Sequence, residues 1–580
     1  MKNHVNKKIV SLSLILLFAI SCKKDFLDVK PTASFGDSQL TSTKGLEGVL
    51  ISVYSMLSGR GQDFYAGSSD WFWGSILGGE ANKGTNAGDQ AQMNEVQTYS
   101  AQPTNGSVRA KYATTYEGIA RANALLRLLA KADPGVSAAD KQRIEAEGKF
   151  LRGHYYFELK KIFNNTPYID ETVDYATGIA KVGNDKDLWP MIEADLLFAY
   201  NNLPETQSAA GRANKWAAGA YLGKAYLYQK KYTEAKAAFD QVIAGGKTAS
   251  GVTYGLVPKY GDLWRMQNNN NQESVFAIQA AAGTGTVNNA NPDFVLNFPY
   301  NGGPAGCCGF FQPSFEQANS FRTDALGLPL LDGSYNTGAN QLVTDEGIAS
   351  GSPFTPDAGN LDPRLDHSVG RRGLPYLDHG MHPGFDWIRD QTYGGPYAPK
   401  KYIWTKAEEA AGGVDKSSWT PGYDGLNVPL IRFADVLLMA AEAEIEVGSP
   451  AQAKTYVNMV RTRATNAAGF VMNGAVPAAN YVIGIYPVTD IWAKDNVARD
   501  KVRFERKLEL SGEGHRFFDL VRWGIAPTTL SAYLLYEGSK ASASPFKGAS
   551  FTTNKSEYLP IPQTEIDILG SSVLKQNPGY

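Results

Sequence analysis

Residues 222–239 read LGKAYLYQKKYTEAKAAF, two short amphipathic segments of helical spacing joined by a polar turn. The small side chains of Gly223 and Ala235 allow two helices to approach closely. Tyr226 and Phe239 are large enough to fill the space between neighbouring helices. This stretch therefore predicts a helical hairpin that packs through small residues and is completed by other helices.

The spacing L-G-x-x-Y followed by A-x-x-x-F is that of a tetratricopeptide repeat. One repeat cannot bury its own apolar face, so the helical segments near 112–130, 141–163 and 185–203 are expected to stack beside it. A second hairpin at 432–446 and 451–464 has similar apolar spacing and is a candidate to complete the bundle. The alternative is a helical hairpin unrelated to this repeat.

The composition of the chain changes after about residue 250. From 251 to 425 it is rich in Gly, Asn, Pro and aromatic residues, with short strand-like runs such as 274–278. We therefore expect a mainly α fold, a tetratricopeptide-like helical-repeat scaffold with a loop-rich, aromatic-rich insertion region and minor short strands. The expected domains are 46–250 and 251–580, and ligand-binding residues tend to lie on loops held by such a scaffold.

The N-terminus has the pattern of a targeting segment. Its first eight residues carry three lysines and no acid, and an apolar run from 9 to 20 follows. Twelve helical residues reach roughly 18 Å, short of the ~30 Å hydrocarbon core of a bilayer. Residues 1–21 are therefore predicted to be a signal peptide that is removed on maturation.

The cleavage position resembles a bacterial lipobox, with Cys22 as the acylated new N-terminus. The alternative is a chance cysteine beside an ordinary cleavage site. Residues 22–45 are polar and are interpreted as the lipid anchor and tether, which would hold the protein on a membrane. Removing residues 1–21 changes the formal net charge from −2 to −5, so the mature chain is not built to bind nucleic acid.

Several separated segments are similar, in order, to those of one family. They read KKDFLD at 23–28, GKFLRGHYYF at 148–157, DPRL at 362–365, LIRFADVLLMAAE at 430–442, RFERKLEL at 503–510, EGHRFFDLVRWG at 513–524, YLPIP at 558–562 and QNPGY at 576–580. The family they resemble is SusD/RagB, and the resemblance spans the mature chain. Gly148 and Gly153 stand where this family usually has alanines.

The resemblance implies a lipid-anchored, surface-exposed lipoprotein of the outer membrane. Such a protein captures an oligosaccharide and passes it to a SusC-like TonB-dependent barrel; it is not an enzyme and needs no cofactor. Three other functions stay open. They are capture of peptides by the same machinery, a surface glycosidase, and a tetratricopeptide scaffold.

Sugar recognition uses flat aromatic faces and planar polar side chains. An extended Trp71-Phe72-Trp73 would place both tryptophans on one side of the chain. The candidate ligand contacts are Asp70, Trp71, Trp73, Asn82, Trp387 and Tyr393. The alternative for each aromatic residue is a place in the core.

The vicinal pair Cys307-Cys308 is flanked by glycines and followed by Phe310 and Phe311. Outside the cytoplasm a disulfide between the two cysteines is permitted. We expect a rigid apolar platform for ligand beside the two phenylalanines. The alternative is a pair of free thiols in a loop.

Glu505 and Glu509 lie one helical turn apart and could be drawn as a glycosidase pair. Neighbouring arginines such as Arg503 and Arg506 would pair with them and lower their pKa values, which is the opposite of what a general acid needs. The sequence contains no G-x-S-x-G, Walker A, G-x-G-x-x-G or H-E-x-x-H motif. No catalytic residue is therefore assigned.

The histidines do not predict a metal site. Residues 378–382 contain Asp378, His379 and His382, and Asp366 and His367 are nearby in the sequence, but their spacing matches no zinc signature. These residues are interpreted as solvated loop residues.

Overall fold

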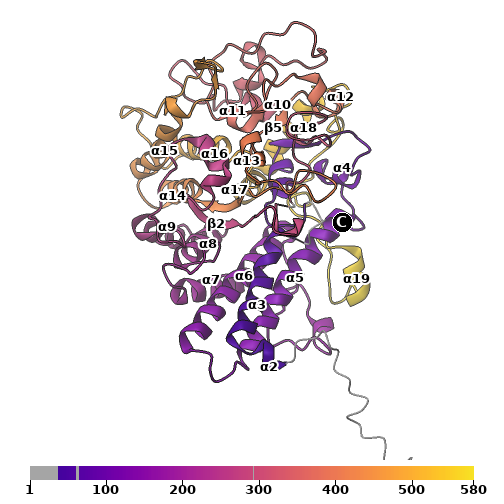
Figure 1. Ribbon diagram of the computed structural model, residues 1–580, viewed down its shortest axis with the longest axis vertical. Helices are drawn as coiled ribbons and strands as arrows, with labels where there is room; N and C mark the ends of the chain where they lie inside the picture. Colours follow the sequence, from indigo (N-terminus) through magenta and orange to yellow (C-terminus); the bar gives the residue numbers. More distant parts are fainter. Residues whose placement is uncertain (1–36, 60–64, 292) are drawn as a thin grey trace, which may run out of the picture.

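The computed structural model describes residues 37–59, 65–291 and 293–580. The expected signal peptide, Cys22 and most of the tether lie outside these residues. In Figure 1 the N-terminal helices form an elongated lower part, and the later helices and loops form a broader upper part. Across the described ranges, no helix has the length and apolar character needed to cross a bilayer.

The helices of the N-terminal half stack in sequence order. Their bounds are α2 Asp37–Leu40, α3 Thr43–Ser55, α4 Gln92–Gln97, α5 Gly106–Leu129, α6 Ala138–Phe163, α7 Trp189–Asn202, α8 Lys215–Tyr228 and α9 Tyr232–Gly245. From α5 to α9, each helix packs against the next, and α3 lies on α5 and α6. Several of these helices have a polar N-cap residue. The side chain of Asn105, for example, accepts hydrogen bonds from the backbone N–H groups of Ser107 and Val108 at the start of α5. The predicted stack of helices is confirmed.

The hairpin α8–α9 has the predicted close approach. A Cβ on Gly223 would lie 2.6 Å from the ring of Phe239, so only glycine fits here without a shift. Ala235 and Phe239 are fully buried. The prediction for Tyr226 is wrong, because this side chain is only half-buried at the edge of the core. Tyr221, one turn earlier, fills the interior instead and contacts three phenylalanine rings.

The C-terminal half adds a second set of helices. They are α10 Phe315–Asn319, α11 Leu365–Ser368, α12 Gln391–Gly394, α13 Lys406–Ala410, α14 Phe433–Glu446, α15 Pro450–Ala464, α16 Asn496–Glu509, α17 Arg516–Trp523, α18 Ala526–Gly538 and α19 Gln563–Leu569. The expected second hairpin is α14–α15. α14 packs on α9 as well as on α15 and α16, and so joins the two halves.

The strands are short and pair two by two, all antiparallel. The pairs are β1 Ala81–Gly84 with β3 Phe310–Pro313, β2 Ser274–Ile278 with β6 Val428–Arg432, β4 Val369–Gly370 with β5 Ala398–Pro399, and β7 Met472–Asn473 with β8 Val476–Pro477. The loop-rich region with minor strands is confirmed. The pairing of β1 with β3 brings two loops more than 200 residues apart in the sequence to one place.

A buried ionic network fastens the loops to α14, α15 and α16. Its cations are Arg364, Lys401, Arg432, Arg461 and Arg463, and its carboxylates are Glu273, Asp362, Glu505, Glu509 and Glu513. Every member is buried. The expected partners of Glu505 and Glu509 are therefore wrong, because Arg503 pairs with Asp500 and Arg506 with Asp435 and Asp519.

Candidate functional site

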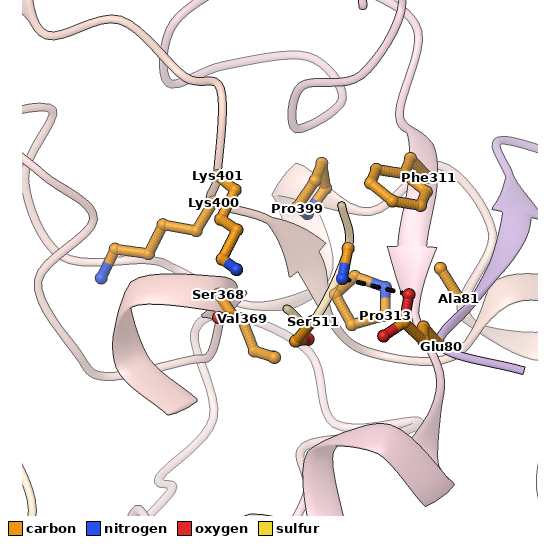
Figure 2. Close-up of a pocket in the computed structure, with 11 residues that line it drawn as sticks. Glu80, Ala81, Phe311, Pro313, Ser368, Val369, Pro399, Lys400, Lys401 and Ser511 are labelled. Atoms are coloured by element: carbon orange, nitrogen blue, oxygen red, sulfur yellow. Dashed lines mark hydrogen bonds between the residues drawn. The ribbon is translucent and has the colours of Figure 1, made fainter. Parts of the chain in front are cut away.

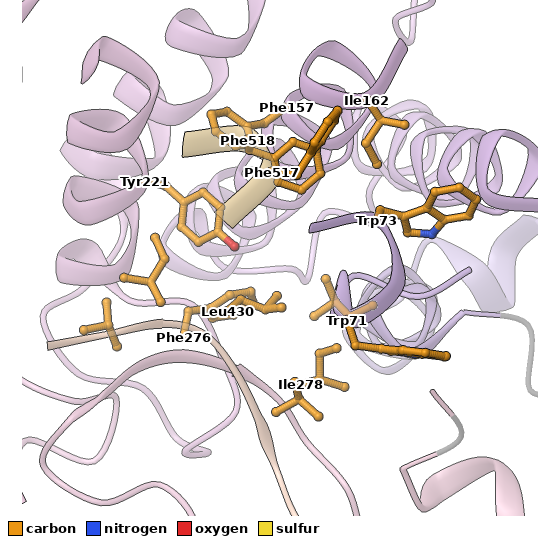
Figure 3. Close-up of a cluster of buried hydrophobic side chains, with 14 of the residues drawn as sticks. Trp71, Trp73, Phe157, Ile162, Tyr221, Phe276, Ile278, Leu430, Phe517 and Phe518 are labelled. Carbon is orange, nitrogen blue, oxygen red and sulfur yellow. The ribbon is translucent and has the colours of Figure 1, made fainter. Parts of the chain in front are cut away.

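Trp71 and Trp73 lie in the interior and not on a ligand surface. The segment Trp71–Ile76 is a turn of π-helix (η3), not an extended strand, so the expected alternation is wrong. Trp71 and Trp73 are 1% and 0% exposed, and Figure 3 shows them among other core side chains. The Nε1 of Trp73 donates to the carbonyl of Tyr65 at 2.6 Å. These indoles fill the junction between helices and loops and offer a ligand no surface.

Three other candidate ligand contacts have partners inside the protein. The carboxylate of Asp70 accepts a hydrogen bond from the Lys111 ammonium at 2.9 Å and also forms an ion pair with Lys161. Asn82 donates from Nδ2 to the carbonyl of Gly394 at 2.8 Å. The hydroxyl of Tyr393 accepts from the side chain of Gln97 at 2.9 Å. All three candidates are buried, so they hold loops together in this structure.

Phe310 and Phe311 are buried as well, at 1% and 5% exposure. Figure 2 shows Phe311 at the edge of a small cavity, above Glu80, whose carboxylate accepts a hydrogen bond from the backbone N–H of Gly512 at 3.2 Å. This cavity measures about 20 Å³, which is room for about one water molecule and not for a sugar. The two buried rings therefore do not form a platform open to ligand.

The disulfide loop itself, residues 300–309, reaches the surface. Cys307 and Cys308 are joined by a disulfide, and Cys307 is half-buried. The ring of Trp387 lies against the loop, because a Cβ on Gly302 would be 2.4 Å from its Nε1 and a Cβ on Gly303 would be 3.0 Å from its ring. Trp387 is partly exposed. The disulfide loop and the segment around Trp387, about 80 residues apart in the sequence, therefore meet here.

A third segment, residues 85–90, completes this surface. The N–H of Thr85 donates to the carbonyl of Gly309 at 2.6 Å. Arg389 donates to the Thr85 hydroxyl at 2.8 Å and to the carboxylate of Asp89 at 2.7 Å. Its guanidinium lies 5.6 Å from the centre of the Tyr300 ring. We call residues 85–90, 300–309 and 385–390 together the loop surface.

Lys83 holds the 85–90 segment from below. Its ammonium donates to the carbonyls of Asn86 and Asp89 at 2.6 Å and 2.5 Å. Burial lowers the pKa of Lys83 to about 8. The turn is therefore fixed by an interior cation, which positions Asp89 for Arg389.

The loop surface has the chemistry of a sugar site. Tyr300 and Trp387 supply partly exposed rings, and Phe385, on the same turn as Trp387, is 45% exposed. Arg389, Asp89 and the amides of Asn86 and Asn301 supply hydrogen-bonding groups. Sequence reasoning missed Tyr300, Phe385, Arg389 and Asp89. The only available signal was their position beside glycine-rich turns.

A larger cavity, about 460 Å³, lies elsewhere, between the end of α3, the edge of β2 and Asn288. Its lining contains a single aromatic ring, Tyr54, whose hydroxyl donates to Glu147 at 2.6 Å. A pyranose would find little stacking surface there. The loop surface is therefore the better candidate.

The paired glutamates Glu505 and Glu509 and the histidines His379 and His382 are all buried. Burial alone would raise the pKa of Glu509, but Arg463, Arg432 and Arg364 hold it well below its usual range, so it cannot donate a proton near neutral pH. His379 and His382 are buried and not solvated as expected; the Nε2 of His379 contacts the carbonyl of Trp404 at 2.9 Å. In the described ranges, no group of three or more His, Cys, Asp or Glu residues is arranged to hold a metal ion.

Comparison with known proteins gives two family matches. Residues 272–580, more than half of the chain, match the SusD family, and residues 25–227 match a family described as starch-binding and associating with the outer membrane. The SusD-like protein P25 of Formosa agariphila is 25% identical over 88% of this chain and 89% of its own length. The starch-binding protein SusD of Bacteroides thetaiotaomicron is 24% identical over the full length of both chains.

Solved structures agree with this assignment. A laminarin-binding SusD-like protein is 26% identical with a TM-score of 0.65, covering 93% of this chain and 99% of that chain. A SusD superfamily protein of Bacteroides vulgatus has a TM-score of 0.67 at 22% identity, with the same coverage, and shows likeness of fold alone. The mainly α architecture, the ordered sequence segments and the family match over residues 272–580 agree, and the chain belongs to the SusD family.

Proposed function

We propose that this protein binds a glycan at the outer surface of the cell, through the loop surface, and delivers it to a SusC-like TonB-dependent barrel. The observation that carries the proposal is the meeting of Trp387 and Tyr300 with the Arg389–Asp89 pair on one accessible surface. Aromatic rings bind the apolar face of a pyranose, and planar charged or amide groups bind its hydroxyls. The binding of laminarin by a relative and of starch by another supports a glycan as ligand.

The charges of the loop surface favour a neutral glycan. Asp89, Asp386 and Asp390 outnumber Arg389, which is already paired with Asp89 at 2.7 Å. A uronic acid or sulfated sugar would meet this excess of carboxylates and be repelled. Neutral glucans, such as laminarin or starch oligosaccharides, are therefore the first ligands to test.

Lipid anchoring at Cys22 and exposure on the outer membrane are part of the same proposal. In the expected bounds, the anchor is followed by a tether of 23 residues, 23–45. Two or more acyl chains on one residue give stable membrane attachment. Labelling of cells with a radioactive or clickable fatty acid should mark the wild-type protein and leave Cys22→Ser unlabelled.

The binding experiment uses calorimetric titration of the mature chain from residue 23 against laminarin and starch oligosaccharides, acidic oligosaccharides and peptides. Trp387→Ala should weaken binding of the neutral glycan at least tenfold, because it removes the largest ring of the surface. Trp523→Ala, a half-buried tryptophan on α17, is the matched control and should bind normally. Binding of peptides alone would transfer the proposal from glycan to peptide capture.

The disulfide has its own test within this proposal. Alkylation of the unreduced protein should add no group to Cys307 or Cys308, and reduction before alkylation should add two. Cys307→Ser combined with Cys308→Ser should weaken glycan binding if the bonded pair shapes the loop against Trp387. Addition of two alkyl groups to the unreduced protein would show that Cys307 and Cys308 are free thiols.

A further inference from the structure

Another pocket lies between α10, α17 and α18, and none of the residues that line it belongs to the loop surface. Its volume is about 270 Å³, close to the lower end of the roughly 300–1,000 Å³ of small-molecule sites. Three tyrosine rings line it: those of Tyr335, Tyr533 and Tyr536. Tyr335 and Tyr533 are buried, whereas Ala532 on the rim is exposed, so the pocket has a floor and an opening.

The charged groups of this pocket leave a positive excess. Glu316 is neutralised by Lys507, whose ammonium lies 2.6 Å and 2.8 Å from the two carboxylate oxygens. Tyr335 donates a further hydrogen bond to Glu316 at 2.7 Å. Arg516 also lines the pocket, and within the described residues no hydrogen bond or ion pair joins its guanidinium to a carboxylate.

The neighbouring ionisable groups do not cancel this excess. Lys540 lies 4.2 Å from the centre of the Tyr536 ring and donates to the neutral amide of Gln341. Burial raises the pKa of Glu80 to about 7 and that of Glu537 to about 8. Near neutral pH Glu537 is therefore mostly uncharged, and Glu80 carries only part of a charge. Among the residues that the structure describes, Arg516 is therefore the unpaired cation of the pocket lining, and Lys540 adds positive charge beside the lining residue Tyr536.

We propose that this pocket binds a small carboxylated sugar, a uronic acid or a short uronate-containing fragment. A guanidinium recognises a carboxylate through two parallel hydrogen bonds, and the tyrosine rings offer apolar faces to the sugar ring. A neutral sugar would leave the Arg516 charge without a partner. The site therefore differs in charge preference from the loop surface, whose carboxylates favour neutral glycans.

The test is calorimetric or NMR titration of the mature chain with D-glucuronate, with D-glucose and with acetate. Glucuronate should bind, glucose should not, and acetate should bind more weakly because it lacks the ring. Arg516→Gln should weaken glucuronate binding about tenfold or more, since removing a charge-assisted hydrogen-bonded pair costs at least about 1.4 kcal/mol. Arg109→Gln, an exposed arginine on α5, is the matched control and should bind as the wild type does.

Lys540→Gln provides a second variant, because it also lowers the positive charge and Lys540 is a partly exposed residue just beyond the end of α18. It should weaken glucuronate binding, and Trp387→Ala should leave it unchanged. Equal affinity for glucose and glucuronate, or unchanged affinity in both Arg516→Gln and Lys540→Gln, would overturn the proposal. Since neutral-glycan binding should survive Arg516→Gln, failure here is distinguishable from failure of the proposed function.

Discussion

Glu509→Gln probes the ionic network on which the C-terminal half is built. The carboxylate of Glu509 lies 2.6 Å from Arg432 and 2.9 Å from Arg364, and it also pairs with Arg463. Glutamine keeps the volume but removes the charge, and its amide N–H groups would face guanidinium donors. The buried residues Arg364, Arg432 and Arg463 would then each lose a carboxylate partner, which leaves buried positive charge uncompensated.

The expected cost is about 3–5 kcal/mol, the range measured when one partner of a buried ion pair is removed. The variant should also change how stability depends on pH in the acid range. Burial alone would raise the folded-state pKa of Glu509, but the three arginines hold it well below its usual range. The stability this supplies is fully present above the unfolded pKa of about 4.3 and is lost as the pH falls toward the folded pKa. The difference between wild type and Glu509→Gln should therefore be largest near pH 7 and shrink below about pH 4.

Urea unfolding followed by circular dichroism measures both effects. Glu446→Gln is the matched control, because Glu446 pairs with Arg499 at 2.6 Å and 2.9 Å but both side chains are partly exposed. It should cost about 0–1 kcal/mol. If Glu509→Gln lowers the unfolding free energy by no more than this control, the buried network does not stabilise the fold as described.

Three further changes test the packing and the charges. Glu537→Gln should stabilise the protein at pH 9 by on the order of a few kcal/mol and little at pH 5. Burial raises the pKa of Glu537 to about 8, so the wild type loses folding stability as the pH rises to that value and the buried carboxyl becomes charged, whereas glutamine stays neutral. Equal melting temperatures for variant and wild type at pH 9 would contradict this. Gly223→Val should lower the unfolding free energy by about 1–3 kcal/mol, because the new side chain clashes with the Phe239 ring. Gly148→Ala is its control in the same urea experiment and should be close to neutral, because its Cβ would lie 3.1 Å from the Leu125 side chain. Asn105→Ala removes the cap of α5 and should cost about 1 kcal/mol, and an unchanged urea midpoint would exclude a role for the cap.

The sequence predicted the architecture well because the fold depends on local patterns. The small residues Gly223 and Ala235, set at tetratricopeptide spacing, were enough to place α8 and α9 and to require stacked neighbours. Tyr226 was misplaced, since a repeat motif does not say whether a third layer of helices covers that ring. The division into domains at residue 250 stays a prediction.

The site could be predicted only in part. An exposed tryptophan and a buried one look alike in a sequence, and Trp71 is buried against Phe294 and Phe311, more than 200 residues away along the chain. Trp387 could be singled out as an aromatic residue in a glycine-rich segment, and the disulfide loop by its two adjacent cysteines. Arg389 and Asp89 became visible only when the pairing of β1 with β3 brought residues 85–90 to the loop surface.

The most direct test of glycan capture is titration of laminarin oligosaccharides and the other neutral glycans into wild type, Trp387→Ala and Trp523→Ala. The account predicts that at least one neutral glycan binds the wild type and Trp523→Ala alike and binds Trp387→Ala at least tenfold more weakly. Binding of that glycan with undiminished affinity by Trp387→Ala would place the site elsewhere on the protein and contradict the assignment of the loop surface.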